Sequence, residues 1–180
     1  MFVSKVFASI RSNSLLAAKS FDMDAIDREI LAILQQDGRI TFTELARKVQ
    51  LSVSRCQRRV RELEEDGVVR GFRGMIDAAK SGFGFEVVAF ATLRGPNAIH
   101  DFDRAIARIP EITEAHRLFG TPDYLLRIVA RDKARYQQLY DDILSKLPGL
   151  RGLKSTMVMK EVIAARGLPL GHTRDMSRGR

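Results

Sequence analysis

Cysteine and long apolar runs are scarce in this 180-residue chain. Its one cysteine, Cys56, cannot form a disulfide within the chain, which fits a reducing compartment, and we expect a cytoplasmic protein. No apolar tract is long enough to span a bilayer, so we expect no membrane partner. The chain also lacks a phosphate-binding glycine loop, a cysteine pair and a nucleophile elbow. The usual sequence signatures of nucleotide binding, dithiol redox chemistry and serine hydrolysis are therefore missing.

Sets of residues with the spacing of a metal site or a catalytic site are missing as well. His100, Asp101 and Asp103 lie close together, but without further ligands they are better explained as the first turn of a helix. His116 lies in an expected strand, where an isolated histidine is more often structural than catalytic. Cys56 lies on the apolar side of an expected helix and should be a small core residue. We therefore expect no cofactor, no metal and no catalytic residue.

Positive charge is abundant. The chain has 30 Lys and Arg residues against 22 Asp and Glu, a formal net charge of +8 and a pI near 10.1. This balance suggests a polyanionic partner without identifying it. Residues 1–21 contain basic residues but no acidic one, a composition that resembles a transit peptide. Structural signals begin only at Met23, so we expect residues 1–22 to be a disordered extension and Met23 to be the natural first residue.

The stretch from Thr41 to Gly67 has the pattern of two short helices joined by a tight turn. Thr41 and Glu44 have the spacing of a capping box for the first helix. Ser52 is a suitable cap for the second helix, which Asp66 and Gly67 should end. The apolar face expected for the first helix consists of Phe42, Leu45, Ala46 and Val49.

The second of these helices separates apolar and basic residues onto opposite sides. Cys56 and three aliphatic residues fall on one side, at steps of three or four: Val53, Val60 and Leu63. An apolar back with a basic, hydrogen-bonding front suits the major groove of DNA, although a solvated helix with extra arginines has the same pattern. As base contacts we predict Ser54, Arg55, Gln57 and Arg58, with Arg58 pointing most directly outward. As phosphate contacts we predict Thr43, Arg47, Arg59, Arg61, Arg70 and Arg73.

The second half of the chain follows the order βαββαβ, the ferredoxin-like arrangement. Together with a helix that begins at Asp24, the two halves predict an α+β protein with a winged-type helix-turn-helix domain and a ferredoxin-like domain. The expected strands are 85–93, 112–119, 124–130 and 154–163, with helices over 99–109 and 136–147 and a small strand within 68–77. The expected domains are 23–72 for DNA binding, 73–84 as hinge, 85–166 for effector binding and oligomerisation, and 167–180 as a mobile tail.

In these features the chain resembles the Lrp/AsnC (feast/famine) family of transcription regulators. The resemblance is carried by the helix-turn-helix stretch, by FGTPDYLLRI from Phe119, and by GLKSTMVMKEV from Gly152. It implies an amino-terminal DNA reader joined to a domain that senses a small molecule, often an amino acid. It also implies a homodimer that pairs through its sheets, with an octamer as a larger assembly. Effectors of the family lie between subunits, which carries over here to Gly120, Thr121, Asp123, Ser155 and Thr156.

The chain departs from the family pattern at two positions. Many members have glycine where Gln50 stands. Either glutamine adopts a left-handed conformation there, at a cost of about 1 kcal/mol, or the geometry of the turn differs slightly. Many also have an acidic residue after the turn glycine, where this chain has Thr121 and Pro122. Asp123 is an acceptor for an ammonium group in one interpretation and a turn residue that binds local backbone in the other.

Two other functions share parts of the pattern. Siroheme decarboxylases are similar in architecture, but they have no need of a basic recognition helix, and we expect no enzyme. An architectural protein that coats DNA with little effector control shares every feature of the DNA-binding half. Steep salt dependence with weak sequence preference would distinguish it from a regulator that responds to an effector.

Overall fold

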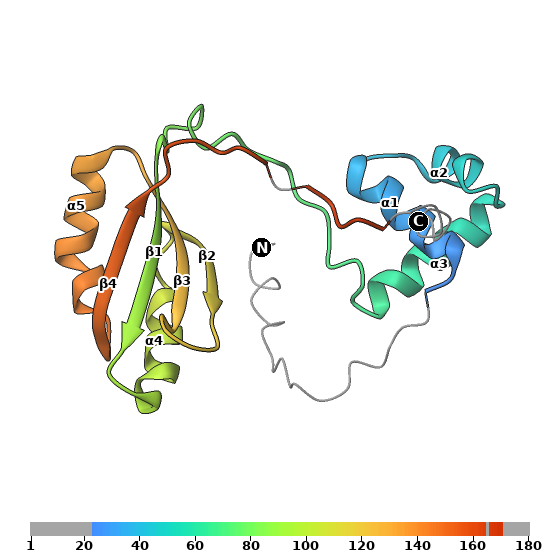
Figure 1. Cartoon of the computed structure of the whole chain (residues 1–180). Helices are drawn as coiled ribbons and strands as arrows, with labels where there is room; N and C mark the ends of the chain where they lie inside the picture. Colours follow the sequence, from blue (N-terminus) through green and yellow to red (C-terminus); the bar gives the residue numbers. More distant parts are fainter. Residues whose placement is uncertain (1–22, 165, 171–180) are drawn as a thin grey trace, which may run out of the picture. The chain divides into compact units, whose positions relative to one another are not determined.

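The chain forms two separate units. The structure, a computed structural model, describes residues 23–164 and 166–170 (Figure 1). One unit contains residues 23–73 and 166–170, and the other contains residues 74–164. The extension expected at residues 1–22 lies outside the described residues.

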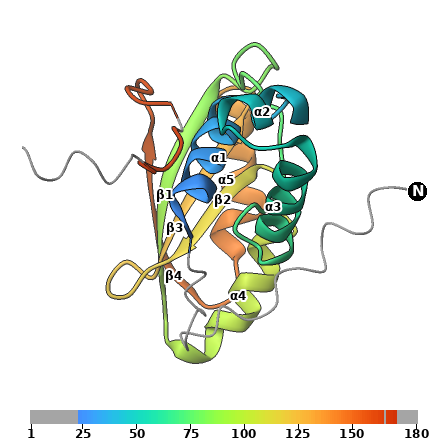
Figure 2. The ribbon, with the colours of Figure 1, turned by 90° about the vertical axis from the view of Figure 1, so that its right-hand side faces the viewer.

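The first unit is a bundle of three helices, α1 (Ala25–Gln36), α2 (Phe42–Lys48) and α3 (Val53–Glu65), all visible in Figure 2. Each helix begins at a side-chain cap. The Thr41 hydroxyl accepts a hydrogen bond from the Glu44 N–H (3.2 Å), and the Glu44 carboxylate accepts one from the Thr41 N–H. Ser52 caps α3 as predicted. The core between the helices contains Ile30, Leu31, Leu45, Ala46, Val49, Cys56, Val60 and Leu63, so Cys56 is a core residue.

The first residue of α2 and that of α3 lie outside this core. Phe42 is 42% exposed and Val53 is 39% exposed, although periodicity assigned both to an apolar face. Periodicity gives the direction in which a side chain points, but not whether another helix reaches that end of the helix. Gln50, in the turn between α2 and α3, has a φ of 56°, so of the two alternatives for this position the left-handed conformation is present.

The second unit has the predicted βαββαβ order. Its strands are β1 (Phe85–Leu93), β2 (Ile112–Arg117), β3 (Tyr124–Ala130) and β4 (Leu150–Met157). The helices are α4 (Ile99–Ile106) and α5 (Lys133–Asp142), with short 3-10 turns at Pro96–Ala98 and Leu144–Lys146. The strands form one antiparallel sheet in the order β2-β3-β1-β4.

Three expected strands need correction: the one expected over 112–119 ends at Arg117, the last strand has other ends, and a small strand does not form. The last strand was expected over 154–163 but runs from Leu150 to Met157. Met157 lies opposite Val87, and the Val158 N–H donates to the Glu86 carbonyl, so the chain reaches the beginning of β1 and has no further partner strand. The small strand expected within 68–77 does not form among the described residues, where this segment is irregular.

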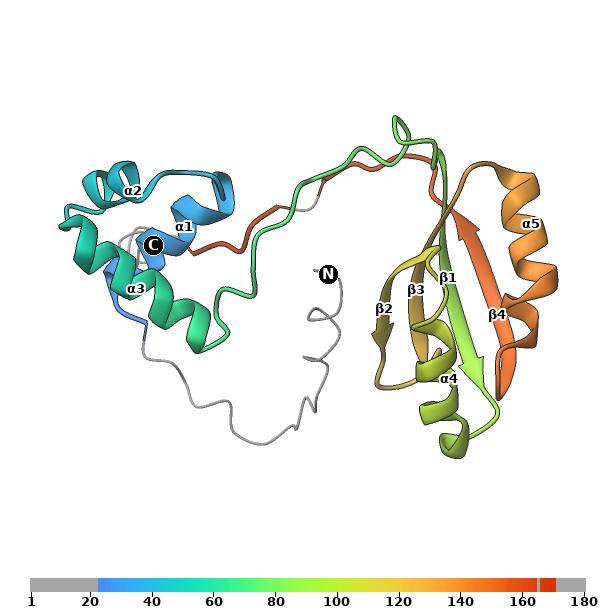
Figure 3. The ribbon, with the colours of Figure 1, turned by 180° about the vertical axis from the view of Figure 1, so that it is seen from behind.

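Both helices of the second unit cover the same face of the sheet, as seen in Figure 3. Alternate residues of β1 and β3 point into this core, which includes Val87, Ala89, Ala91, Leu93, Tyr124, Leu126 and Ile128 with Phe102 and Leu139 from the helices. The residues between them lie on the other face, which we call the open face. Its apolar members Val88, Phe90, Leu125 and Val129 are half-buried.

The segment 166–170 belongs to the first unit. The Gln35 amide of α1 donates to the Leu168 carbonyl (3.3 Å) and accepts from the Leu168 N–H, and Leu170 packs on the three-helix core. Of the tail that we expected to be mobile, residues 167–170 therefore lie against α1, and residues 171–180 are outside the described part. No helix within 23–164 and 166–170 is long and apolar enough to cross a membrane.

Candidate functional site

The outward side of α3 carries the predicted base contacts. Ser54, Arg55, Gln57, Arg58 and Arg61 are all exposed, while Cys56, Val60 and Leu63 hold the opposite side in the core. The Arg58 side chain is 66% exposed and forms an ion pair with Glu62 one turn later (2.8 Å). An exposed pair of this kind contributes little to stability, so Arg58 is free to exchange Glu62 for another partner.

Arg59 is not part of this surface, which corrects the prediction of a phosphate contact. Its guanidinium is bound by Asp27 (2.7 Å) and Asp24 (2.8 Å), and its side chain is only 24% exposed. The hydrogen bond that Arg59 donates to Asp27, followed by the one that it donates to Asp24, raises the pKa of Arg59. The hydrogen bond from the Asp27 N–H, with a further contribution from Arg59, lowers the pKa of Asp24. Arg59 therefore links α3 to the start of α1 through these two ion pairs.

The other candidate phosphate contacts are exposed. Thr43 and Arg47 lie on α2, which precedes α3 in the helix-turn-helix. Arg70 and Arg73 lie in the irregular segment after α3. None of the three arginines forms an ion pair with another residue in the described part of the chain. The exposed basic surface therefore extends from α2 through α3 to the segment that follows it.

The candidate effector turn is fixed by the strand next to it. The Asp123 carboxylate accepts a hydrogen bond from the Leu93 N–H (2.7 Å), and the Asp123 N–H donates to the Ala91 carbonyl (3.0 Å). Tyr124, directly after the turn, is 2% exposed and donates to Asp103 of α4 (2.7 Å). Burial and this hydrogen bond raise the pKa of Tyr124. Of the two interpretations of Asp123, the one in which it binds backbone agrees with these contacts.

The five predicted effector residues do not form one site within the chain. Gly120 and Thr121 are exposed in the β2–β3 turn, beside the end of β1. Ser155 lies opposite Ala89 and faces the helices, because the Tyr136 hydroxyl of α5 donates to its hydroxyl (2.5 Å). Thr156 lies opposite Val88, so its side chain points to the open face. Neighbouring strand residues point to opposite faces, and this separates two residues that sequence reasoning had grouped.

A cavity between α5 and the sheet was not predicted. Its volume is about 300 Å³, and its walls are mainly Phe85, Val87, Tyr136, Tyr140 and Met157, with Lys133, Gln137 and Ser155 at polar positions. The rings of Phe85 and Tyr136 lie 5.7 Å apart, and those of Tyr136 and Tyr140 lie 6.5 Å apart. Both tyrosines lie within the helix expected over 136–147. Their spacing of four residues, which places both on one side of α5, was the available signal.

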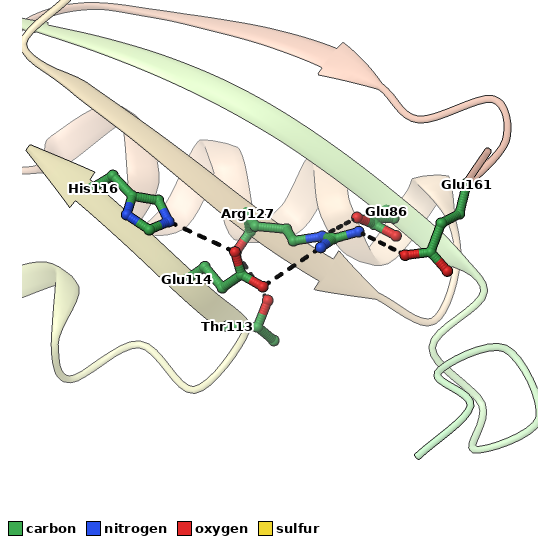
Figure 4. A network of polar contacts seen from close by, with 6 residues as sticks. All are labelled: Glu86, Thr113, Glu114, His116, Arg127 and Glu161. Carbon is green, nitrogen blue, oxygen red and sulfur yellow. Dashed lines mark hydrogen bonds and ion pairs between the residues drawn. The ribbon is translucent and has the colours of Figure 1, made fainter. Parts of the chain in front are cut away.

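A polar network on the open face was also missed (Figure 4). Arg127 of β3 forms ion pairs with Glu86 of β1, with Glu114 of β2 (3.4 Å) and with Glu161 (3.5 Å). His116 lies 3.7 Å from Glu114. The hydrogen bond that Arg127 donates to the Glu86 carboxylate raises the pKa of Arg127. These residues come together only through the pairing of strands, which the sequence does not give.

Metal-binding side chains do not gather anywhere in the described residues. Across 23–164 and 166–170, no three His, Cys, Asp or Glu side chains could hold a metal ion together. Asp101 lies in the first turn of α4, as the sequence predicts, and Asp103 binds Tyr124. His100, Asp101 and Asp103 are thus explained by the local structure.

Models of known protein families match both parts of the chain. Residues 23–70 match the family model for winged helix-turn-helix DNA-binding domains, and residues 87–168 match that for the Lrp/AsnC ligand binding domain. The chain is 38% identical over 143 residues to the leucine-responsive regulatory protein of Escherichia coli, covering 78% of this chain and 87% of that protein. The same values hold for the leucine-responsive regulatory protein of Salmonella typhimurium.

Solved structures lead to the same family. A transcriptional regulator of Neisseria meningitidis, solved as a complex with L-Met, has a TM-score of 0.78 and 31% identity, covering 83% of this chain and 98% of that one. An AsnC family transcriptional regulator of Agrobacterium tumefaciens has a TM-score of 0.76 and 34% identity, covering 82% and 97%. These are regulators rather than enzymes. The chain belongs to the Lrp/AsnC family of transcriptional regulators, with a DNA-binding and a ligand-binding domain.

Proposed function

We propose that the chain is a sequence-specific regulator that binds DNA as a homodimer and responds to a small effector, an amino acid or a related metabolite. The observation that carries the proposal is the outward side of α3, where Ser54, Arg55, Gln57 and Arg58 are exposed above a buried apolar back. Arginine and glutamine hydrogen-bond to base edges in the major groove. Thr43, Arg47, Arg61, Arg70 and Arg73 are the proposed phosphate contacts.

The open face of the sheet supports a dimer. Its two central strands carry the apolar side chains of Val88, Phe90, Leu125 and Val129 on either side of Arg127, which is paired with Glu86, and a second copy would remove these apolar side chains from water. A two-fold dimer presents two α3 helices, so it would bind two half-sites about one turn of DNA apart or a multiple of that spacing. An octamer built from such dimers remains part of the proposal.

The proposed class of effector comes from the family and its members. The relatives are named for leucine, and one solved neighbour carries L-Met. Gly120 and Thr121 at the exposed turn and Ser155 in the cavity are the candidate contacts that the geometry leaves open, and they would join one site only across two copies. Asp123 supports the turn instead, and Thr156 lies on the proposed dimer face.

The test is a mobility-shift titration on DNA from just upstream of the chain's own gene, with excess random competitor. A discrete complex that changes with one metabolite from a panel is the expected result. Binding without any response to the panel would favour the architectural alternative, particularly if it were steeply salt-dependent. Absence of binding above competitor would contradict the proposal.

Arg58→Ala tests the base contact. We expect it to weaken binding to the preferred site by about 1–3 kcal/mol and to weaken binding to random DNA less, because a base contact carries sequence information. Arg61→Ala, a predicted phosphate contact on the same helix, should weaken both equally. Arg108→Ala, exposed in the other unit, is the control for the loss of one positive charge. Equal losses on both DNAs for Arg58→Ala would make Arg58 a phosphate contact.

A further inference from the structure

The cavity between α5 and the sheet has the chemistry of a binding site. At about 300 Å³ it is at the small end of the range for ligand pockets. Phe85, Tyr136 and Tyr140 supply aromatic walls, and Val87 and Met157 supply aliphatic ones. Met157 is 60% exposed, so this apolar surface is reachable from solvent. The size and the lining suit one branched aliphatic or small aromatic group.

The polar groups of the cavity carry a single charge, which is positive. Lys133, the first residue of α5, is exposed and takes part in none of the ion pairs found within the described residues. Its neighbour Asp132 has its carboxylate engaged by the Arg135 N–H (2.8 Å), where it caps α5. Gln137, Tyr136 and Ser155 add neutral hydrogen-bonding groups. Lys133 is therefore available to pair with an anionic group on a ligand.

A partner for an ammonium group is absent from the same cavity. None of its lining residues in the described chain carries a carboxylate. At the turn, the one candidate acceptor for an ammonium group, Asp123, already accepts from the Leu93 N–H (2.7 Å). An ammonium group placed in the cavity would gain no charged partner among its lining residues, whereas a carboxylate would gain Lys133.

We infer that this cavity binds an apolar monocarboxylate without an ammonium group, such as a branched-chain 2-oxo acid, in preference to the corresponding amino acid. The carboxylate pairs with Lys133, and the apolar group packs between Tyr136, Tyr140 and Phe85. The inference rests on the proposed function only in that this ligand is taken to be the effector. Binding itself does not require the first unit.

The experiment compares two ligands that differ only at the α-carbon. Titration calorimetry on the full chain without DNA would use 4-methyl-2-oxopentanoate and leucine. We expect the oxo acid to bind roughly tenfold more tightly or better, because leucine brings an unpaired ammonium group. Leucine binding as tightly as the oxo acid, or no binding of the oxo acid, would overturn the inference.

Variants at the cavity locate the ligand. Lys133→Gln should weaken oxo-acid binding roughly tenfold, since it removes the charged partner, and Lys133→Arg should keep most of it. Lys146→Gln, an exposed lysine that does not line the cavity, is the matched control. Tight binding that is unchanged in Lys133→Gln would place the ligand elsewhere and overturn the inference.

The two proposals fail in distinguishable ways. DNA binding by a chain that does not bind the oxo acid would refute the ligand class and leave the regulator intact. Lys133-dependent binding of the oxo acid by a chain that does not bind DNA would uphold the ligand site and refute the proposed function.

Discussion

At the scale of single residues, Gln50 is held in a conformation that suits glycine better. Its φ of 56° lies in the left-handed region, which costs a residue with a Cβ roughly 1 kcal/mol or more. Gln50 is exposed, and its N–H donates to the Arg47 carbonyl (3.4 Å) at the end of α2. The turn between α2 and α3 sets the angle of the recognition helix, and glutamine makes it less stable than it could be.

Gln50→Gly should therefore stabilise the first unit by about 0.5 kcal/mol. Relief of the left-handed backbone exceeds the added entropy of glycine in the unfolded chain. Denaturant titration measures the free energy of unfolding, and Gln50→Val, with a β-branched side chain, should lower it. Lys48→Gly, at the exposed end of α2, should cost about 1 kcal/mol and controls for glycine alone. A loss of stability in Gln50→Gly would contradict the assignment of strain.

Arg59 and its neighbour Arg58 should contribute very differently to the free energy of unfolding. Arg59→Gln would leave the nearly buried Asp27 without its charged partner, so we expect a loss of about 2 kcal/mol in the free energy of unfolding. Arg58→Gln, which breaks only an exposed pair with Glu62, should cost less than about 0.5 kcal/mol. Thermal and denaturant unfolding of both variants checks the difference. If the two variants had the same free energy of unfolding, the ion pairs of Arg59 would not stabilise the contact between α3 and α1.

At the scale of elements, the helices of the first unit were predictable from local sequence signals. The ends of the strands depend on which strands pair. The caps at Thr41 and Ser52 depend on residues three positions away, so the sequence shows them directly. The end of β4 depends on where β1 begins, which the sequence of β4 does not contain. Arg59 was predictable in part: it precedes Leu63 by four residues, and that spacing places it toward the buried side of α3. What the spacing could not give is Asp27, which lies on another helix.

In the β2–β3 turn, variants of Asp123 can distinguish a structural role of this residue from a role in binding a ligand. Asp123→Ala should destabilise the second unit by about 1–2 kcal/mol, because the Leu93 N–H loses its acceptor. Asp123→Asn keeps an oxygen acceptor there and should restore most of this stability. Calorimetric unfolding and ligand titration of both variants distinguish the roles. If Asp123→Asn were stable but no longer bound any effector, Asp123 would be a ligand contact after all.

At the scale of the whole molecule, each unit supplies one half of the function. The first unit holds a single recognition helix, which reads only one half-site. The second unit has apolar side chains on the open face of its central strands, on either side of the ion-paired Arg127. Pairing of the second units would therefore give the first units a second half-site to bind, and the affinity for a full site should depend on residues that never touch DNA.

Phe90→Lys tests this dependence. Phe90 lies on β1 in the centre of the open face, and a lysine there would be buried without a partner against a second copy. We expect sedimentation analysis to show a monomer, and binding to a site with two half-sites to fall at least tenfold while binding to one half-site persists. Gln138→Lys, exposed on α5, adds the same charge away from the open face and should leave the dimer unchanged. A folded Phe90→Lys chain that still sediments as a dimer would move the dimer contact to another surface, because a buried lysine cannot be tolerated at the centre of a tight apolar interface.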